Sequence, residues 1–584
     1  MLEFSPQRDS DMQTLKQLLS RQVRDAFTAA FPDADASSLP LDVLPAANEA
    51  FGDFQCNAAM TASRLLHQPP RAIAEQVAAH LPDHGLLAKV EVAGPGFLNL
   101  TLSDEAMARH LEEMQADTHL GLPQPGAGRT LLIDYSSPNV AKPMHIAHIR
   151  STVIGDALKR IHRALGYTVL GDNHLGDWGT QFGILIMGYR HFLDEKALAA
   201  SPVDELQRLY VLSHQKAEES PEWKDQCRAE LVKLQAGDPE NHALWKKFID
   251  LSMAEFNRIY DRLDVHFELV RGESFYNDAL PGVVEKLLSL GLIRKSEGAW
   301  VAFLEEEKLP PCIVRKSDGA FNYATTDLAT VFSREAEFHP DTILYITDER
   351  QQLHFRQFFC LARKAGAKVN LQHVWFGLMR LPEGLLSTRK GTAIKLDHLL
   401  DESVRRAQEL VHTSSPDMPE DRQREVAEAI GIGAVKYADL SQNPQSAVNF
   451  SWEKALSMDG NSAPYLQYAC ARIASVLDKH RDRFPDCDPM AAPILLDAPQ
   501  ARRLALRLAH LPSAILEAAT QEKPSILADA LYDLSQAYSS YYQNVPFLKA
   551  AAGIRESRVR LCDLTARALR RGLDLLGIRT PERI

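Results

Sequence analysis

Apolar residues recur every three or four positions through most of the chain, and short apolar runs interrupt this helical pattern in its middle part. Leu131–Asp134 is one such run, Ile146–Leu165 carries apolar residues at helical spacing, and Tyr167–Leu170 is a second run. Gly166 suits the end of the helix, because glycine adopts a left-handed backbone most easily. This order of strand, helix and strand predicts a βαβ unit of a parallel nucleotide-binding sheet.

The same pattern divides the chain into three parts. Residues 1–118 mix helical and strand-like segments and predict a small α+β domain. Residues 119–400 predict a Rossmann-like parallel sheet, with a charged, helical insertion at about 190–300. Residues 401–584 predict an all-α bundle. Further segments expected are a hairpin over Lys89–Leu102, strands at Thr342–Thr347 and His373–Met379, and helices at Met12–Phe31, Arg71–Leu81, Gln352–Ala365, Arg422–Leu440, Pro464–His480, Ala501–Ala519, Pro524–Tyr541 and Arg555–Leu576.

Composition narrows the class of protein. The 584 residues contain no apolar run near the roughly 18 needed to span a bilayer, and the first residues lack the pattern of a secretory signal. Seven cysteines form no C-x-x-C pair, which fits a reducing compartment. We therefore expect a cytoplasmic protein without a membrane segment.

The charge distribution leaves room for a nucleic-acid partner. A net charge of -12 argues against a wholly basic coat, but local patches act at short range. Residues 501–584 hold 13 Lys and Arg against 8 Asp and Glu, so the end of the bundle is locally basic. The arginines that dominate it are Arg555, Arg558, Arg567, Arg570 and Arg571. A solvated helix face is the alternative interpretation.

The start of the helix that follows the first strand carries candidate chemistry. His145 and His148 are three residues apart, so both imidazoles lie on one face of the first turn. Backbone N–H groups at a helix N-terminus favour phosphate, and Lys142 adds a mobile positive charge. Two alternatives remain from these residues alone. One is an amphipathic helix with solvated histidines, and the other is a zinc site, which no cysteine pair or H-E-x-x-H pattern supports.

The residues around His145 and His148 form a longer motif with them. SSPNVAKPMHIAH followed by IRSTVIGDAL resembles the signature of class I aminoacyl-tRNA synthetases, and in particular that of the arginyl-tRNA synthetase family. Ala147 stands where that class has the glycine of His-Ile-Gly-His, and we expect its extra methyl group to be tolerated. FGDFQ (Phe51–Gln55) and GPGFLNL are similar to the family's N-terminal additional domain, and SAPYLQYACARI is similar to its anticodon-binding domain.

The resemblance implies an arginine–tRNA ligase. Such an enzyme uses ATP with Mg²⁺ to convert L-arginine into arginyl-adenylate, and then transfers arginine to the 3′ end of tRNA(Arg). It implies a monomer, with Mg²⁺ carried by ATP and not by a protein metal site. The insertion shows no hydrolytic motif, so we expect no editing activity.

On the nucleotide side, the resemblance implies roles for His145, His148 and Lys142. A second basic loop is expected at Ser387, Thr388, Arg389 and Lys390, where class I enzymes usually carry Lys-Met-Ser-Lys-Ser. Lys142 is then the candidate that replaces the missing lysine of that motif. Taken alone, this loop is a basic turn.

A guanidinium presents a planar fork of donors, which a carboxylate meets best. Asp134 and Asp327 match acidic residues of the family's arginine pocket. The alternative for each Asp considered alone is a helix-cap or turn residue. The remaining arginine-binding candidates are Ser136, Asn139, Tyr323 and Gln351. The tRNA-binding candidates are Phe51, Gln55, Tyr465, Tyr468 and Arg472, of which Tyr468 is equally a core candidate.

Two other functions remain open at this point. Another class I ligase or a small-molecule nucleotidyltransferase would use the same sheet, but it would not need the basic bundle or the N-terminal domain. A catalytically inactive relative would bind tRNA only, and it would not need the histidines, Lys142 or the carboxylates.

Overall fold

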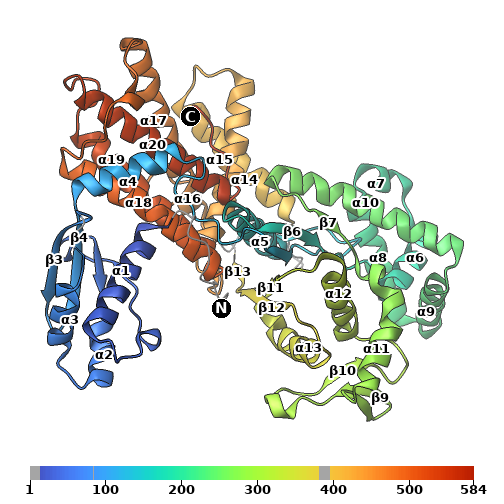
Figure 1. The fold of residues 1–584 in the computed structure, drawn as a ribbon. Coiled ribbons are helices and arrows are strands. Elements are labelled where there is room, and N and C mark those ends of the chain that lie inside the picture. The colour runs from blue at the N-terminus through green and yellow to red at the C-terminus, as the bar shows by residue number, and fades with distance from the viewer. Residues whose placement is uncertain (1–12, 83–84, 381–394) are drawn as a thin grey trace. The chain divides into compact units, whose positions relative to one another are not determined.

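The computed structural model of the chain describes residues 13–82, 85–380 and 395–584 (Figure 1). The chain forms two compact units, which join segments far apart in the sequence. Unit 1 consists of Met1–Pro125, Thr413–Arg422 and Ser457–Ile584, and unit 2 of Gly126–His412 and Gln423–Leu456. Within the described ranges, no helix is both long and apolar enough to cross a lipid bilayer.

Unit 2 is built on a parallel sheet of strand order β12-β11-β5-β6-β7. The strands are β5 (Thr130–Asp134), β6 (Thr168–Asn173), β7 (Leu269–Val270), β11 (Thr342–Asp348) and β12 (Asn370–Phe376). The helices that connect them are α5 (Ile146–Ala164), α12 (Tyr323–Phe338) and α13 (Gln352–Lys364). Because both faces of a parallel sheet are covered, its strands read as continuous apolar runs. Leu131–Ile133 are accordingly at most 2% exposed, and the predicted βαβ unit is confirmed.

The charged insertion lies between β6 and β7. Its helices are α6 (Gln181–Phe192), α7 (Glu195–Ala200), α8 (Pro202–Glu219), α9 (Pro221–Gln235) and α10 (Pro239–Leu263). The 3-10 helix η3 (Glu273–Ala279) and helix α11 (Leu280–Ser289) follow β7.

A small antiparallel sheet of order β10-β9-β8 comes next, with strands β8 (Arg294–Ser296), β9 (Ala299–Ala302) and β10 (Cys312–Arg315). The hydrophobic pattern did not predict this sheet, because strands of three or four residues are too short to show alternation. The small sheet, α11, α12 and α13 share one hydrophobic core with β11. This shared core brings η3 against α12.

Unit 1 combines an antiparallel sheet with a helical bundle. The sheet has the order β1-β2-β4-β3, with strands β1 (Leu44–Pro45), β2 (Phe54–Cys56), β3 (Leu87–Ala93) and β4 (Phe97–Leu102). The helices of its N-terminal part are α1 (Leu15–Ala30), α2 (Ala58–Leu66), α3 (Pro70–Ala79) and α4 (Asp104–Ala116). The bundle consists of α17 (Ala463–Arg483), α18 (Pro499–Thr520), α19 (Pro524–Asn544) and α20 (Ile554–Leu575), which confirms the helices predicted there.

An ion pair with a buried carboxylate links the loop before β2 to the bundle inside unit 1. The carboxylate of Asp53 accepts two bonds from the guanidinium of Arg502 on α18, both at 2.9 Å. The same carboxylate accepts the backbone N–H of Leu102 at 2.7 Å. The Asp of the FGDFQ motif therefore has a structural partner within its own unit.

The segment after residue 395 begins in unit 2. It contains α14 (Leu396–Ser414), α15 (Glu420–Leu440), α16 (Trp452–Ala455) and β14 (Val448–Asn449). Strand β14 pairs in parallel with the earlier strand β13 (Met379–Arg380). The buried Arg150 of α5 bonds to Asp439 of α15 at 2.8 Å and to the carbonyl of Gly377 at 2.6 Å. Short 3-10 turns complete the chain at η1 (Ala36–Ser38), η2 (Glu49–Phe51), η4 (Glu305–Glu307), η5 (Glu349–Gln351) and η6 (Pro489–Ala491).

Candidate active site

The two histidines of the signature stand at the start of α5, at the carboxyl edge of the parallel sheet. His145 is the N-cap residue, and its Nδ1 accepts the backbone N–H of Ala147 at 3.3 Å. The Nδ1 atom of His148 accepts the backbone N–H of His145 at 3.0 Å. The two ring centroids are 4.0 Å apart. The rings therefore form one cluster at the helix N-terminus, as the spacing predicted.

Both imidazoles are neutral near pH 7. Burial, and then the neighbouring His145, lower the pKa of His148 to about 3. Burial, and then the charge of Lys142, also lower the pKa of His145. Because Nδ1 of each ring accepts a backbone hydrogen, the ring hydrogen is assigned to Nε2. Each histidine thus offers an N–H donor without a positive charge.

Lys142 supplies the positive charge beside this pair. Its side chain is exposed, and Nζ lies 5.4 Å from the ring centroid of Tyr210 on α8. Its effect on the pKa of His145 shows that the ammonium group acts on the histidine cluster. The next residues, Pro143 and Met144, line a polar pocket of about 360 Å³.

Asp134 ends β5 and lies beside Asp172 of β6 in the register of the sheet. Arg334 of α12 donates from Nη2 to Oδ2 of Asp134 at 2.7 Å and to Oδ2 of Asp172 at 2.8 Å. The guanidinium of Arg334 is fully buried. One oxygen of the candidate Asp134 is thus already bonded to a guanidinium of the protein itself. Its contact with a substrate stays a prediction.

The turn after β5 holds adjacent serines in left-handed backbone conformations, with φ of 70° at Ser136 and 49° at Ser137. The hydroxyl of Ser136 lies in the interior, 2.8 Å from that of Tyr260. The hydroxyl of Ser137 donates to Oδ1 of Asp134 at 3.0 Å instead. Ser136 is the serine predicted from the sequence, but Ser137 is the serine that bonds to the candidate carboxylate. Asn139 is exposed and forms a backbone bridge with Gly176.

The second candidate carboxylate lies on α12. Tyr323 is the first residue of this helix and is 70% exposed, and Asp327 follows one turn later. Oδ2 of Asp327 is 2.5 Å from Nε2 of His354 in the first turn of α13. Gln351 is exposed and directly precedes that helix. Tyr323, Asp327 and Gln351 therefore come from the starts of two neighbouring helices.

Glu273 is a carboxyl group near Asp327 that was not predicted from the sequence. Burial raises the pKa of Glu273 to about 8, and the negative charges of Asp177 and Asp327 add to this effect. Asp177 is held by Ser274, whose N–H and hydroxyl donate to it at 2.9 and 2.6 Å. A Cβ atom at Gly272 would lie only 2.1 Å from the Asp177 carboxyl group, so only glycine permits this approach. Because burial and neighbouring carboxylates oppose the ionisation of Glu273, a cation bound beside it would favour its ionised form.

A hydrogen-bond chain joins the histidine helix to the turn after β5. The hydroxyl of Thr152 lies 2.7 Å from the carbonyl of His148 and 2.8 Å from the hydroxyl of Ser136. The described part of unit 2 therefore links the start of α5 to Ser136, which directly precedes Ser137, the serine bonded to Asp134. The predicted basic loop, with Ser387, Thr388, Arg389 and Lys390, lies outside the described residues. In the part of the chain with assigned positions, no group of three His, Cys, Asp or Glu side chains could hold a metal ion.

The predicted tRNA-contact residues of the N-terminal region differ in exposure. Phe51 is 47% exposed, and Gln55 is half-buried and donates to Asn99 at 2.7 Å. Phe51 is thus the more accessible of the two.

The bundle candidates share one face of α17. Tyr468 is 37% exposed, and the guanidinium of Arg472 lies 4.7 Å from its ring centroid. The same guanidinium lies 5.2 Å from the ring of Tyr542. Tyr465 is half-buried, with its hydroxyl 3.1 Å from that of Ser539. The core alternative for Tyr468 is therefore wrong, since its ring is accessible.

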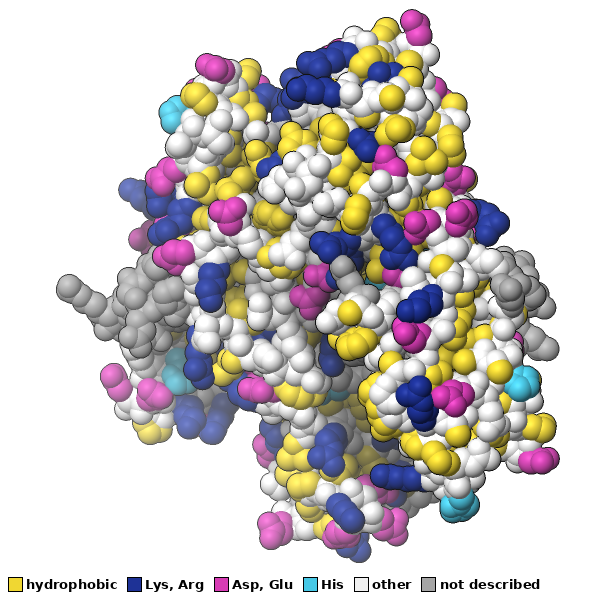
Figure 2. All heavy atoms as spheres, turned by 90° about the vertical axis from the view of Figure 1, so that its left-hand side faces the viewer, with side chains coloured by type: hydrophobic (Ala, Val, Ile, Leu, Met, Phe, Trp, Pro, Cys, Tyr) yellow, Lys and Arg dark blue, Asp and Glu magenta, His cyan; other side chains and the backbone are white. Residues whose placement is uncertain are grey.

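Several arginines of the basic C-terminal segment are bound within unit 1. Arg558 pairs with Asp497 at 2.6 Å, and Arg567 donates to the carbonyl of Gln115 at 2.9 Å. Arg570 is exposed. On the face drawn in Figure 2, Lys and Arg side chains are interspersed with acidic and hydrophobic ones. This mixed surface agrees with local patches and not with a basic coat.

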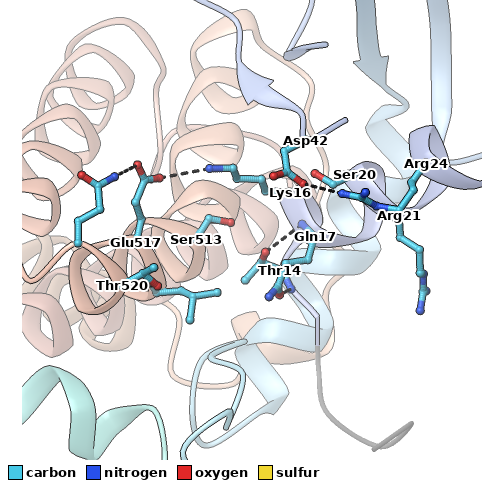
Figure 3. Close-up of a pocket in the computed structure, with 12 residues that line it drawn as sticks. Thr14, Lys16, Gln17, Ser20, Arg21, Arg24, Asp42, Ser513, Glu517 and Thr520 are labelled. Carbon is cyan, nitrogen blue, oxygen red and sulfur yellow. Dashed lines mark hydrogen bonds and ion pairs between the residues drawn. The ribbon is translucent and has the colours of Figure 1, made fainter. Parts of the chain in front are cut away.

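A pocket of about 490 Å³ lies in unit 1 between α1 and α18 (Figure 3). Lys16 reaches across it to Glu517 at 3.2 Å, and Arg24 pairs with Asp42 at 3.6 Å. The pair between Lys16 and Glu517 therefore connects α1 to α18 across this pocket.

Comparison with protein families places known domains along the chain. The catalytic domain of class I tRNA synthetases of the arginine type matches residues 110–452. The arginyl-tRNA synthetase N-terminal domain matches residues 13–102, and the DALR anticodon-binding domain matches residues 466–584.

Individual proteins agree with these matches over nearly the full length. An arginine–tRNA ligase of Fusobacterium nucleatum is 44% identical over 96% of this chain and 99% of its own. One from Escherichia coli is 41% identical over 98% of this chain and 100% of its own. The solved arginyl-tRNA synthetases of Plasmodium falciparum and Thermus thermophilus are each 25% identical, with TM-scores of 0.83 and 0.81 over 98% of this chain and 100% of theirs.

Proposed function

The chain belongs to the arginyl-tRNA synthetase family of class I enzymes and is an ATP-using arginine–tRNA ligase, and from this premise we propose which residues carry its two steps. The observation that carries the assignment is the set of three family matches in order along one chain, with full-length relatives at 40–44% identity. We further propose that the protein is a cytoplasmic monomer and that Mg²⁺ enters the site bound to ATP. The three-domain division at residues 118 and 400 is likewise our proposal.

We propose that the histidine cluster binds the ATP phosphates. In the first step the arginine carboxylate attacks the α-phosphate and pyrophosphate leaves, so negative charge must be stabilised and the groups aligned. The neutral Nε2–H donors of His145 and His148 suit phosphate oxygens, and Lys142 adds the mobile charge. The Ser387–Lys390 segment is proposed to act from the other side. In the second step a ribose hydroxyl of tRNA(Arg) attacks the carbonyl carbon of the adenylate, the ester to arginine forms and AMP leaves.

We propose that the carboxylate cluster of Asp327 and Glu273 binds the guanidinium of L-arginine. The negative charge of Asp327 opposes the ionisation of Glu273, a bound guanidinium would favour that ionisation, and it offers enough N–H donors for both carboxyl groups. Asp134, with Ser136 or Ser137 and Asn139, is proposed at the amino-acid end, and Tyr323 and Gln351 add polar contacts. Lysine carries a compact charge without the fork, so it should be rejected strongly.

We propose that tRNA(Arg) contacts Phe51 and Gln55 with its elbow, and Tyr465, Tyr468 and Arg472 with its anticodon. The exposed ring of Tyr468 and the guanidinium above it support this, because unstacked bases stack on such groups.

ATP–pyrophosphate exchange with each amino acid, with and without tRNA(Arg), tests the function directly. Among the amino acids tested, arginine and no other is expected to drive exchange. Exchange driven by lysine or another amino acid in place of arginine would point to a different class I ligase. No exchange with any amino acid, even with tRNA present, would indicate an inactive tRNA-binding relative.

The raised pKa of Glu273 predicts that arginine binding depends on pH. With a pKa of about 8, the carboxyl group is largely protonated at pH 7 in the empty site. A bound guanidinium favours the ionised form, so binding releases a proton and becomes stronger as the pH rises towards 8. The arginine Kd should fall by about tenfold or more between about pH 6.5 and 8.5, and level off above that.

Calorimetry in two buffers of different ionisation enthalpy measures this proton release. In the Glu273→Gln variant, which cannot ionise, both the release and the slope of Kd against pH should disappear. A wild-type Kd that does not change over this range would contradict the assignment of Glu273 to the arginine site.

A further inference from the structure

Asp327 shares its carboxylate with a histidine from the neighbouring helix. Nε2 of His354 lies 2.5 Å from Oδ2 of Asp327, a short distance of the kind seen for bonds to a charged group. The side chains of His354 and Asp327 are 33% and 25% exposed, so the bond is accessible to solvent and is not part of the deep core. α12 and α13, which carry the two residues, pack side by side (Figure 1).

The His354 ring is fixed by aromatic neighbours. Its centroid lies 5.3 Å from that of Phe358 and 5.8 Å from that of Phe355 on the same helix. Phe355 in turn stacks on His373 of β12 at 4.2 Å and 17°. His373 lies 2.8 Å from the hydroxyl of Thr347 on β11. The imidazole is therefore held by a chain of contacts that ends on the parallel sheet.

This arrangement limits how Asp327 can meet a substrate. Oδ2 faces His354, and among the residues with assigned positions Oδ1 accepts no hydrogen bond from the protein. A guanidinium that bonded both oxygens of Asp327 would compete with His354 for Oδ2. A guanidinium between Asp327 and Glu273 needs only Oδ1 of Asp327 and leaves the histidine bond intact.

We propose that His354 is a positioning residue for L-arginine, which holds the Asp327 carboxylate so that Oδ1 is oriented to accept from the guanidinium. This inference rests on the proposed role of Asp327 in the arginine site. It assigns to His354 no contact with ATP and no direct part in the chemistry. Without the bond from His354, the Asp327 carboxylate is free to rotate. Arginine then binds more weakly, although Asp327 keeps its negative charge.

Steady-state ATP–pyrophosphate exchange with five variants, three at His354, Asp327→Ala and the double variant, tests the inference. His354→Ala should raise the arginine KM about tenfold and leave the ATP KM unchanged. His354→Gln, whose amide N–H can reach Oδ2, should stay within about threefold of wild type. His354→Asn is one methylene shorter and should behave like alanine. In the Asp327→Ala background, His354→Ala should have no further effect on the arginine KM.

The outcomes separate this inference from the proposed function. If Asp327→Ala raises the arginine KM but His354→Ala does not, the positioning role is wrong and the arginine site stands. An equal effect of His354→Ala with and without Asp327 also overturns it, because the histidine would then act independently. If Asp327→Ala itself changes nothing, the proposed arginine site fails. Thermal unfolding of each variant checks that a higher KM does not come from a damaged fold.

Discussion

Replacing Asp327 by alanine is expected to raise the arginine KM by about 30- to 100-fold while the ATP KM stays unchanged. Removal of one partner from a hydrogen-bonded charge pair costs about 2–5 kcal/mol. The Asp327 side chain is 25% exposed, so solvent screens the pair and the lower end of this range applies. About 2–3 kcal/mol corresponds to the stated change in KM. Initial rates of ATP–pyrophosphate exchange over a range of arginine concentrations measure it.

Two variants make this result specific. Asp327→Asn keeps the shape and one acceptor oxygen but removes the charge, so it should lie between wild type and alanine. Asp225→Asn is a control, because Asp225 is also a carboxylate of unit 2 but lies on α9 and pairs with Arg228 at 3.1 Å. It should leave the arginine KM as in wild type. If Asp327→Ala has wild-type kinetics, the residue does not belong to the arginine pocket.

The framework of the catalytic unit could be predicted because its signals are local. Leu131–Asp134, Ile146–Leu165 and Tyr167–Leu170 each show their own periodicity, and they correspond to β5, α5 and β6. The strands β8, β9 and β10 gave no such signal, since each spans at most four residues. These three strands form a sheet because of the residues that pack against them, and the sequence alone does not reveal those residues.

The candidate site shows the same division between local and distant information. His145 and His148 could be paired from their spacing, because one helix turn brings them together. Glu273 could not, because it joins Asp327 only through the packing of η3 against α12. The partner of Asp134, Arg334, is likewise 200 residues away in the chain. Of the adjacent serines, the sequence could not tell which one faces Asp134, because that depends on the left-handed backbone of the turn.

Lys142 is the residue whose removal should affect the chemical step most selectively. It is exposed and close enough to lower the pKa of His145, and neither observation involves the carboxylate cluster. We therefore expect Lys142→Ala to lower kcat about 100-fold and to leave the arginine KM unchanged. This is the lower end of the loss seen when one donor to a developing negative charge is removed. Lys142→Arg keeps a positive charge at this position and should recover part of the rate.

A matched control distinguishes this role from a general effect of losing a lysine. Lys247 of α10 also lies over a tyrosine ring, 5.2 Å from the centroid of Tyr189, and its substitution by alanine should leave kcat unchanged. Tyr210→Phe keeps the ring next to Lys142 and should have little effect. Single-turnover formation of arginyl-adenylate measures the step directly. A Lys142→Ala enzyme with a wild-type rate would mean that the histidines and the Ser387–Lys390 segment stabilise the leaving pyrophosphate without it.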